Sequence, residues 1–373
     1  MNGERIKLAR KRCGLSLRDL ARKMDYIVTA QAIGKYERNE MTPSSEVLIS
    51  LTRALDVSLA YLMAPQAVEL GEVEFRTKAN TSARDRAKVE TAVLESVERY
   101  LQIEQILELD SAAWSRPNSM PVSIAEAEQA ETLADRLRDQ WALGFDPIPN
   151  MTELLEEKGI KVLIEDLPDK VSGFTCMVRR KGEAGVPVIV VNQRVNLERR
   201  RFTLAHELAH RMIGTRHAEE PALEKWCNRF AGAFLMPSVH LQREVGQQRT
   251  AFGYQELVDL KRFYRVAASA LLVRLEQVGV ISRSSLQYAF RTFARGWRSQ
   301  EPDPLEQDST AERPRRFERL VYRALAEDMI ALSKAAELLR QSVAQVERGL
   351  KGPTGANHHD RRADKREEEA RLT

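Results

Sequence analysis

Cysteine and long apolar runs are what this sequence lacks most clearly. Its 373 residues include only three cysteines, Cys13, Cys176 and Cys227, which are widely spaced and form no C-x-x-C pair. A disulfide scaffold is therefore not expected. No apolar run approaches membrane-spanning length, and the N-terminus lacks the apolar core of a signal peptide. These absences predict a cytoplasmic protein that has no membrane partner.

An excess of charge of either sign is also missing. The chain has 58 lysines and arginines against 54 aspartates and glutamates, which gives a net charge of +4. The overall charge therefore does not argue for nucleic acid as a partner. The hydrophobic content of 43% in a chain of this length is enough for two or three cores, so we expect several domains.

Histidine is scarce too, and this draws attention to one motif. Only six histidines occur, and two of them lie in the run F-T-L-A-H-E-L-A-H at 202–210. His206 and His210 are four residues apart, so on an α-helix they share one face and can bind one Zn²⁺. Glu207 lies beside them, where a carboxylate could accept a proton from metal-bound water. Because a bare H-E-x-x-H has only three fixed positions, this interpretation needs further support.

A zinc site also needs a third protein ligand, and residues 224–237 (E-K-W-C-N-R-F-A-G-A-F-L-M-P) offer one. This segment is predicted to be a second helix that ends at its proline. Gly214 is expected to end the first helix and let the chain reverse, so that Glu224 faces the two histidines. Asn228, one turn further on the same face, could hold a ligand or the bound water in place. His217 is a rival ligand, but its spacing from the motif is not that of the metzincins, and a surface position is expected for it.

Together, the two blocks resemble the ImmA/IrrE family of zinc metallopeptidases over roughly residues 120–290. The resemblance implies that His206, His210 and Glu224 bind Zn²⁺. It also implies that Glu207 is the general base and that the fold around these residues is an α+β zincin-like fold. The substrates of this family are typically helix-turn-helix repressors.

The first 65 residues are predicted to form a helix-turn-helix domain. Ser16 and Thr29 are good N-caps for two short helices that are joined by a tight turn. The runs S-L-R-D-L-A and A-I-G-K-Y-E-R-N, followed by T-P-S, resemble the XRE (Cro/C1-type) repressor domain. The predicted domain therefore spans residues 1–65.

This second resemblance implies double-stranded DNA as a partner and places a recognition helix at 30–38. Gln31 and Lys35 would face the major groove, where glutamine can read adenine, and Arg38 would touch phosphate. The alternative is a dimerisation or peptide-binding module that kept the fold and lost DNA binding, since the helix otherwise carries small residues with little base-reading chemistry.

The rest of the chain supplies the domain boundaries. The predicted fold class is mainly α with a small β-sheet: an N-terminal all-α domain, an α+β zincin-like domain and a helical C-terminal region. Helices are expected at 84–109, 124–142, 151–158, 197–212, 224–237, 254–261 and 267–275, and strands at 160–164, 173–178 and 187–191, with a hairpin loop at 181–185. The predicted divisions are a linker and long helix at 66–120, the metallopeptidase domain at 121–298, a flexible linker at 299–312, a helical segment at 313–350 that includes a weaker second helix-turn-helix, and a disordered charged tail at 351–373.

We therefore expect a cytoplasmic zinc endopeptidase fused to a DNA-binding domain, which cleaves a helix-turn-helix repressor or a similar regulator to control transcription. A homodimer is compatible with this interpretation. The alternative is an antitoxin-like transcription regulator whose zinc domain is a sensor or a scaffold. The sequence does not identify the residue that stabilises the oxyanion, for which Tyr254, His217 and Arg211 are the candidates.

Overall fold

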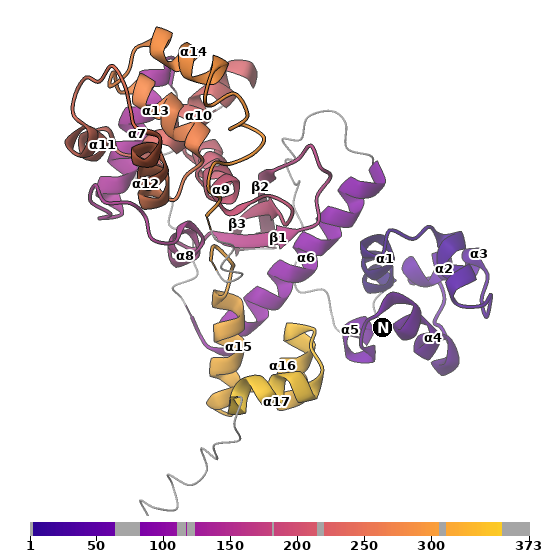
Figure 1. Cartoon of the computed structure of the whole chain (residues 1–373). Coiled ribbons are helices and arrows are strands. Elements are labelled where there is room, and N and C mark those ends of the chain that lie inside the picture. The colour runs from indigo at the N-terminus through magenta and orange to yellow at the C-terminus, as the bar shows by residue number, and fades with distance from the viewer. Residues whose placement is uncertain are drawn as a thin grey trace, which may run out of the picture. The chain divides into compact units, whose positions relative to one another are not determined.

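The computed structural model describes residues 3–63, 83–109, 117, 124–180, 183–214, 220–305 and 311–352. The described chain is mainly helical with one small sheet (Figure 1), which confirms the predicted fold class. It divides into two compact units, residues 1–97 with 111–314 and residues 98–110 with 315–373. The division falls within the long helix α6 (Ala83–Ile106). None of the described helices is long and apolar enough to cross a membrane.

Five short helices form the N-terminal domain, and two of them begin where their capping residues predict. The Ser16 hydroxyl accepts a hydrogen bond from the Asp19 N–H while the Asp19 carboxylate accepts one from the Ser16 N–H, and Thr29 caps its helix by accepting from the Ala32 N–H. The residues buried at the centre include Ile6, Leu20, Ile33, Leu51 and Leu55. The helices are α1 (Gly3–Arg12), α2 (Leu17–Lys23), α3 (Ala30–Glu37), α4 (Ser45–Leu55) and α5 (Leu59–Met63).

The first half of α6 is attached to this domain through Glu95. This glutamate is only 2% exposed, and its carboxylate accepts hydrogen bonds of 2.7 Å from Arg12 Nη1 and of 2.7 Å from the Tyr61 hydroxyl. A buried carboxylate is tolerated when it is paired in this way. The half of α6 before residue 98 therefore belongs structurally with the N-terminal helices. The linker expected at 64–82 lies outside the described residues.

A three-stranded sheet forms the centre of the next domain. The strands β1 (Lys161–Glu165), β2 (Gly173–Arg180) and β3 (Glu183–Asn192) have the order β1-β3-β2, with β1 parallel and β2 antiparallel to β3. The third strand begins at residue 183, four residues before its predicted start, because Val186 and Glu183 still pair with β2. The predicted loop at 181–185 therefore includes three residues, 183–185, that belong to β3. Residues 181–182 lie outside the described part of the chain.

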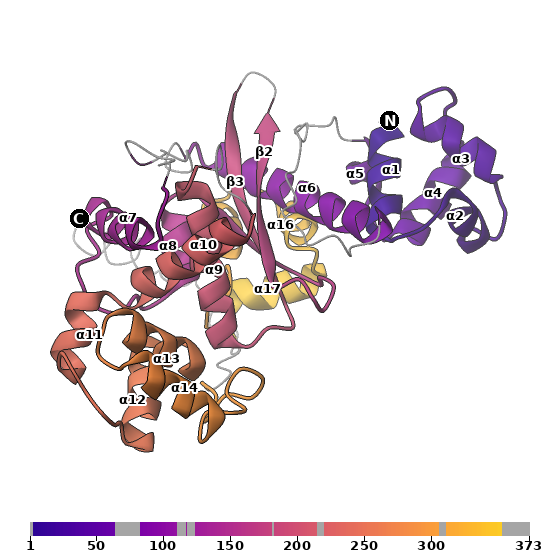
Figure 2. The same cartoon turned by 90° about the horizontal axis from the view of Figure 1, so that it is seen from above.

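Helices cover this sheet and continue after it. Helix α9 (Leu197–Met212), which has the predicted bounds, packs against β2, β3 and α10 (Figure 2). Helix α10 (Glu220–Leu235) begins four residues before its predicted start. The remaining helices are α7 (Ala127–Gln140), α8 (Met151–Glu157), α11 (Ser238–Val245), α12 (Tyr254–Tyr264), α13 (Ala268–Gln277) and α14 (Arg283–Arg291), of which α11 and α14 were not predicted.

The segment expected to be a flexible linker at 299–312 instead makes buried contacts with the helices around it. Glu312 is 1% exposed, forms an ion pair with the buried Arg201, and accepts hydrogen bonds from the N–H groups of Met151 (2.9 Å) and Thr152 (2.8 Å) at the start of α8. Glu301 lies 3.4 Å from the buried ammonium of Lys261. Its proline and charge content suggested a linker, but these charges are the partners of buried cations.

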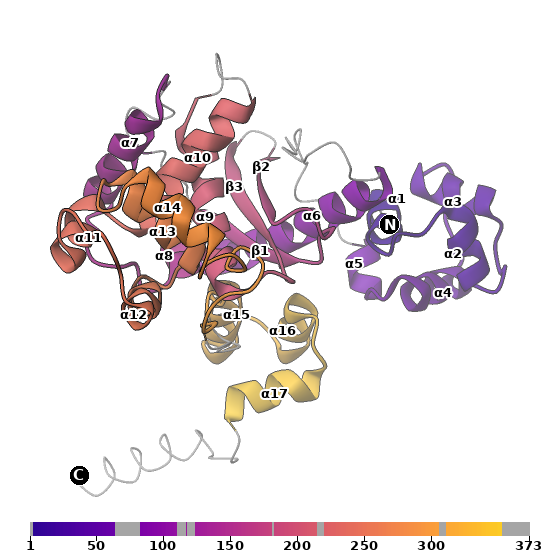
Figure 3. The ribbon, with the colours of Figure 1, turned by 45° about the horizontal axis from the view of Figure 1, so that its top comes forward.

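The second compact unit is helical, as predicted for 313–350. It consists of the last turns of α6 with α15 (Arg316–Ala326), α16 (Leu332–Leu339) and α17 (Val343–Lys351). Figure 3 shows the last three helices as a small group. Their shared core includes Tyr100, Ile103, Val321, Ala335 and Val346. The predicted tail lies outside the described residues from 353 onward.

Candidate metal centre and DNA-binding face

The two motif histidines lie side by side on α9 and turn the same ring atom toward each other. The Nε2 atoms of His206 and His210 are 3.1 Å apart, and the two side chains are 13% and 3% exposed. The helical spacing of four residues places both rings on one face, as the sequence predicts. Neighbouring residues of α9, including Leu204, Ala205 and Leu208, are fully buried and fix the helix against the core.

Glu224 of α10 completes this convergence. Its two carboxylate oxygens lie 3.3 Å from His206 Nε2 and 3.3 Å from His210 Nε2. Two ligand atoms that are each bound at about 2.0–2.1 Å to a tetrahedral zinc ion are separated by about 3.4 Å. The three side chains therefore have the chemistry and the mutual spacing of a zinc ligand set.

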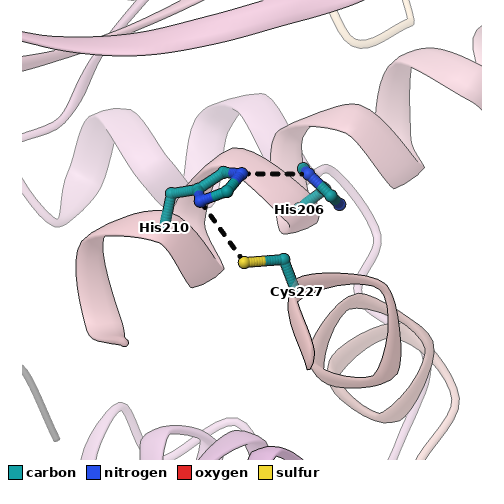
Figure 4. Close-up of side chains that lie close together, drawn as sticks. All are labelled: His206, His210 and Cys227. Carbon is teal, nitrogen blue, oxygen red and sulfur yellow. Dashed lines mark hydrogen bonds between the residues drawn. The ribbon is translucent and has the colours of Figure 1, made fainter. Parts of the chain in front are cut away.

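The other edges of the two imidazole rings are also occupied. His206 Nδ1 lies 3.1 Å from Asn228 Oδ1, and His210 Nδ1 lies 3.4 Å from the sulfur of Cys227. Figure 4 shows that the contacts of His210 with His206 and with Cys227 leave from its two different nitrogen atoms. Asn228 therefore holds the orientation of a histidine, which is one of the two roles predicted for it.

Cys227 was not predicted to take part in the site. Its sulfur and the histidine nitrogens can be grouped within 4.8 Å of one another, which would make it a possible ligand. Its partner, however, is His210 Nδ1, whereas Glu224 meets both histidines at Nε2. Glu224 therefore faces the side of the two rings that they share, and Cys227 contacts the opposite edge of His210. Its place three residues after Glu224, on the same face of a helix, is the signal that could have indicated it.

The contacts between Glu224 and the two histidines shift the pKa values of Glu224 and His206. Hydrogen bonds from His206 and His210 hold the pKa of Glu224 well below its ordinary range. Burial alone would lower the pKa of His206, but the hydrogen bond with Glu224 and the charges of Glu207 and Glu224 outweigh it and raise this pKa. The carboxylate of Glu224 is thus ionised in this arrangement and attracts positive charge. Glu207 itself is 6% exposed, on the same helix as the histidines.

The predicted DNA-contact residues lie together on the N-terminal domain. Gln31, Lys35 and Arg38 are exposed and line one open groove of about 440 Å³ on the outer face of α3. Arg18 of α2, which was not predicted, lines the same groove. Arg38 forms hydrogen bonds of 2.6 Å and 2.9 Å with the exposed carboxylate of Glu40. An exposed pair of this kind is weak and can exchange for phosphate at little cost.

Comparison with protein families agrees with the two domains that carry these residues. Residues 155–276 match the peptidase family model described as the IrrE N-terminal-like domain, and residues 6–62 match the model described as helix-turn-helix. The first range contains the sheet, α9 and α10, and the second contains α2 to α4 with most of α1 and α5. The chain joins an XRE-type helix-turn-helix domain to an ImmA/IrrE-type peptidase domain. No curated protein sequence matches the chain.

Of the three candidates for oxyanion stabilisation in the ImmA/IrrE-type domain, two are described. Arg211 donates a hydrogen bond of 2.8 Å to the Thr175 hydroxyl and another to the carbonyl of Cys176, so it ties the metal helix to β2. Tyr254 is 56% exposed and packs edge-on against Trp297. His217 lies outside the described residues. Arg211 therefore connects α9 to β2, whereas the side chain of Tyr254 is largely exposed.

Proposed function

We propose that this DNA-binding protein is an active zinc endopeptidase of the cytoplasm, which cleaves a helix-turn-helix repressor or a similar regulator and so controls transcription. The observation that carries this proposal is the convergence of His206 Nε2, His210 Nε2 and the Glu224 carboxylate within 3.3 Å of one another, beside Glu207.

His206, His210 and Glu224 would hold the metal, and Asn228 and Cys227 would keep the two imidazole rings turned toward it. Bound there, zinc would supply Lewis-acid chemistry and lower the pKa of water to about 7. Glu207 accepts a proton from the water as its oxygen attacks the scissile carbonyl carbon. Glu207 then donates that proton to the amide nitrogen as the carbon–nitrogen bond breaks, so that it ends the cycle ionised.

The sheet offers a way to bind an extended substrate. In the order β1-β3-β2, strand β2 pairs with β3 on one side only among the described residues, and α9 packs against it. An unpaired strand edge can bind a peptide through main-chain hydrogen bonds. Because Arg211 joins α9 to β2, a peptide added along this edge would be held by the same element that contacts the metal helix.

The nature of the substrate follows from the combination of the two domains. Substrates of the family are typically helix-turn-helix repressors, and this chain carries a domain of that class, which can bring it to operators or to dimer surfaces of similar proteins. Cleavage would remove a repressor from its operator. The proposal is compatible with a homodimer.

Three substitutions test the proposed function. His206→Ala and Glu224→Ala should each lower the zinc content of the purified protein below one ion per chain, because three protein ligands are usual for a catalytic zinc site. Glu207→Gln should keep zinc and lose cleavage, since it removes the base and leaves the ligands. Metal content is measured by mass spectrometry of the purified protein.

Cleavage is measured as the set of cellular proteins that disappears on expression of the wild-type chain. Glu220→Ala, an exposed glutamate one turn before Glu224 on α10, is the matched control and should keep both zinc and cleavage. Cleavage by Glu207→Gln at the wild-type rate would reject the catalytic assignment. If the wild-type chain binds one zinc ion and no cellular protein disappears on its expression, the zinc domain would instead be a sensor or a scaffold.

A further inference from the structure

The helix pair α16–α17 has the geometry of a second helix-turn-helix. Helix α16 ends at Leu339 and α17 begins at Val343, so the turn has three residues, the length typical of this motif. Arg340 in the turn adopts the left-handed conformation with φ of 54°. Ser342 and Gln345 form a capping box that fixes the start of α17. Figures 1 and 3 show α17 lying across the end of α16 rather than alongside it.

The burial pattern of this pair repeats that of α2–α3 in the N-terminal domain. In the first helix of each pair, α2 and α16, the residues four and five positions after the N-cap are buried. In the second helix of each pair, α3 and α17, the residue four positions after the N-cap is buried. These positions are Leu20 and Ala21 with Ile33 in the first pair, and Ala335 and Ala336 with Val346 in the second.

The outer faces of the two second helices repeat as well. In α3 the exposed residues two, six and nine positions after the cap are Gln31, Lys35 and Arg38. The corresponding exposed residues of α17 and its end are Ala344, Arg348 and Lys351. Positions with this spacing lie on one side of a helix, opposite the buried residue at position four. Helix α17 therefore carries two cations, Arg348 and Lys351, on its exposed face. This face corresponds to the face of α3 that is expected to contact DNA.

The unit has the remaining parts that a DNA-binding domain needs. Helix α15 supplies a third helix, as in three-helix variants of the motif, and Arg99 of α6 donates a hydrogen bond of 2.6 Å to the carbonyl of Leu338 at the end of α16. Residues 315–352 contain eight lysines and arginines and five aspartates and glutamates, compared with eleven and seven in residues 3–63. The net charges, +3 and +4, have the same sign and similar size.

Two details of α17 favour nucleic acid over a protein partner. Lys351 is paired with Glu347 at 2.6 Å, but both side chains are about half exposed, so this pair can exchange for a phosphate contact. Val343 and Ala344 in the first turn are exposed, and small apolar side chains there can contact thymine methyl groups. The N-terminal turn of a recognition helix is the part that reaches the base edges.

We infer that α16 and α17 form a second double-stranded DNA-binding site in this chain. Helix α17 enters the major groove with Val343 and Ala344 toward the bases, and Arg348 and Lys351 bind phosphate. The chain thus carries two DNA-binding units, one before and one after the ImmA/IrrE-type domain.

The first test places a negative charge at the proposed interface. It uses the full-length protein with Lys35→Ala and Arg38→Ala, so that a labelled random-sequence DNA duplex reports the second site. Ala344→Glu should then weaken the remaining binding by about tenfold or more, because like charges juxtaposed at an interface cost several kcal/mol. It should not lower the unfolding temperature, since an acidic residue in the first turn favours a helix. Val239→Glu is the matched control, at the same position of α11 and 41% exposed.

The second test removes charge in the same background. Arg348→Ala with Lys351→Ala should reduce the slope of log affinity against log salt by about 2, as expected for two lost phosphate contacts. Arg243→Ala with Arg291→Ala, which removes two exposed arginines from α11 and α14, should not change it. Equal binding by Ala344→Glu and Val239→Glu would overturn the inference. So would a change in molar mass by light scattering with Ala344→Glu at unchanged DNA affinity, which would make the pair a protein interface.

Discussion

Each histidine of the metal centre uses one ring nitrogen for the metal side and the other for its orientation. His210 contacts Glu224 through Nε2 and Cys227 through Nδ1, at 3.3 Å and 3.4 Å, and His206 divides its contacts between Glu224 and Asn228 in the same way. An imidazole held at both edges has a fixed tautomer and a fixed direction. In the proposed metal site, Asn228 and Cys227 would therefore preorganise the two histidines without being ligands themselves.

This division predicts the effect of replacing Cys227. Cys227→Ser should retain one zinc ion per chain with an affinity about 10–100-fold weaker, as is usual when a group that orients a ligand is changed. Cys176→Ala is the control, because burial raises the pKa of the Cys176 thiol to about 12 and keeps it protonated. Both affinities are measured by competition with a zinc chelator. The cobalt-substituted wild-type protein should show no sulfur-to-metal charge-transfer band, and a band that Cys227→Ser abolishes would make Cys227 a ligand.

The convergence of His206, His210 and Glu224 could be predicted from the sequence, but the contact of Cys227 with His210 could not. His206 and His210 share a helix face by spacing alone, and Glu224 follows from the second motif. Which ring edge meets Cys227 depends on how α9 and α10 pack, and spacing does not encode that packing. The contact between Arg38 and Glu40 likewise depends on the conformation of the turn after α3.

At the scale of elements, Glu312 links three parts of the peptidase domain. It pairs with Arg201 of α9 and accepts the first N–H groups of α8, which otherwise have no partner within their own helix. A carboxylate at a helix N-terminus is also favoured by the helix dipole. Glu312 therefore connects α9, which carries His206 and His210, to the start of α8.

Glu312→Ala should consequently destabilise the peptidase domain by about 3–5 kcal/mol, because it leaves the buried charge of Arg201 uncompensated. The free energy of unfolding is measured by urea denaturation. The control is Glu327→Ala, which removes an exposed i,i+4 pair with Arg323 and should cost less than about 1 kcal/mol. Similar losses in the two variants would show that the segment that carries Glu312 is not part of the domain core.

The same elements show where prediction from sequence ends. The H-E-x-x-H spacing and Gly214 predict the bounds of α9 closely, because those signals are local. The prolines and charges of 299–312 predict a linker, yet Glu301 and Glu312 pair with Lys261 and Arg201, which lie far away in the sequence. The start of β3 was missed for the same reason, since it is set by pairing with β2.

At the scale of the whole molecule, the covalent connection of a DNA-binding domain to a peptidase domain changes the concentration at which the active site meets its target. Covalent connection of two modules can raise their effective concentration to the millimolar range when the connection lets both reach their targets. A peptidase with little sequence preference of its own can therefore act selectively on a regulator bound near the same operator. Deleting the N-terminal domain would also remove the partners of Glu95, so substitutions on its surface are the cleaner test.

Lys35→Ala with Arg38→Ala should slow cleavage of the natural target in cells and leave cleavage of concentrated target in vitro unchanged. Both side chains are exposed, so their loss should not alter zinc content or unfolding temperature. The control is Lys7→Ala with Arg22→Ala, which removes two cations of α1 and α2 that do not line the groove. The target is first identified as a protein lost with the wild type and retained with Glu207→Gln. Its half-life in cells is then followed at matched abundance of each variant, and equal half-lives for both double variants would mean that DNA binding does not direct the peptidase to its substrate.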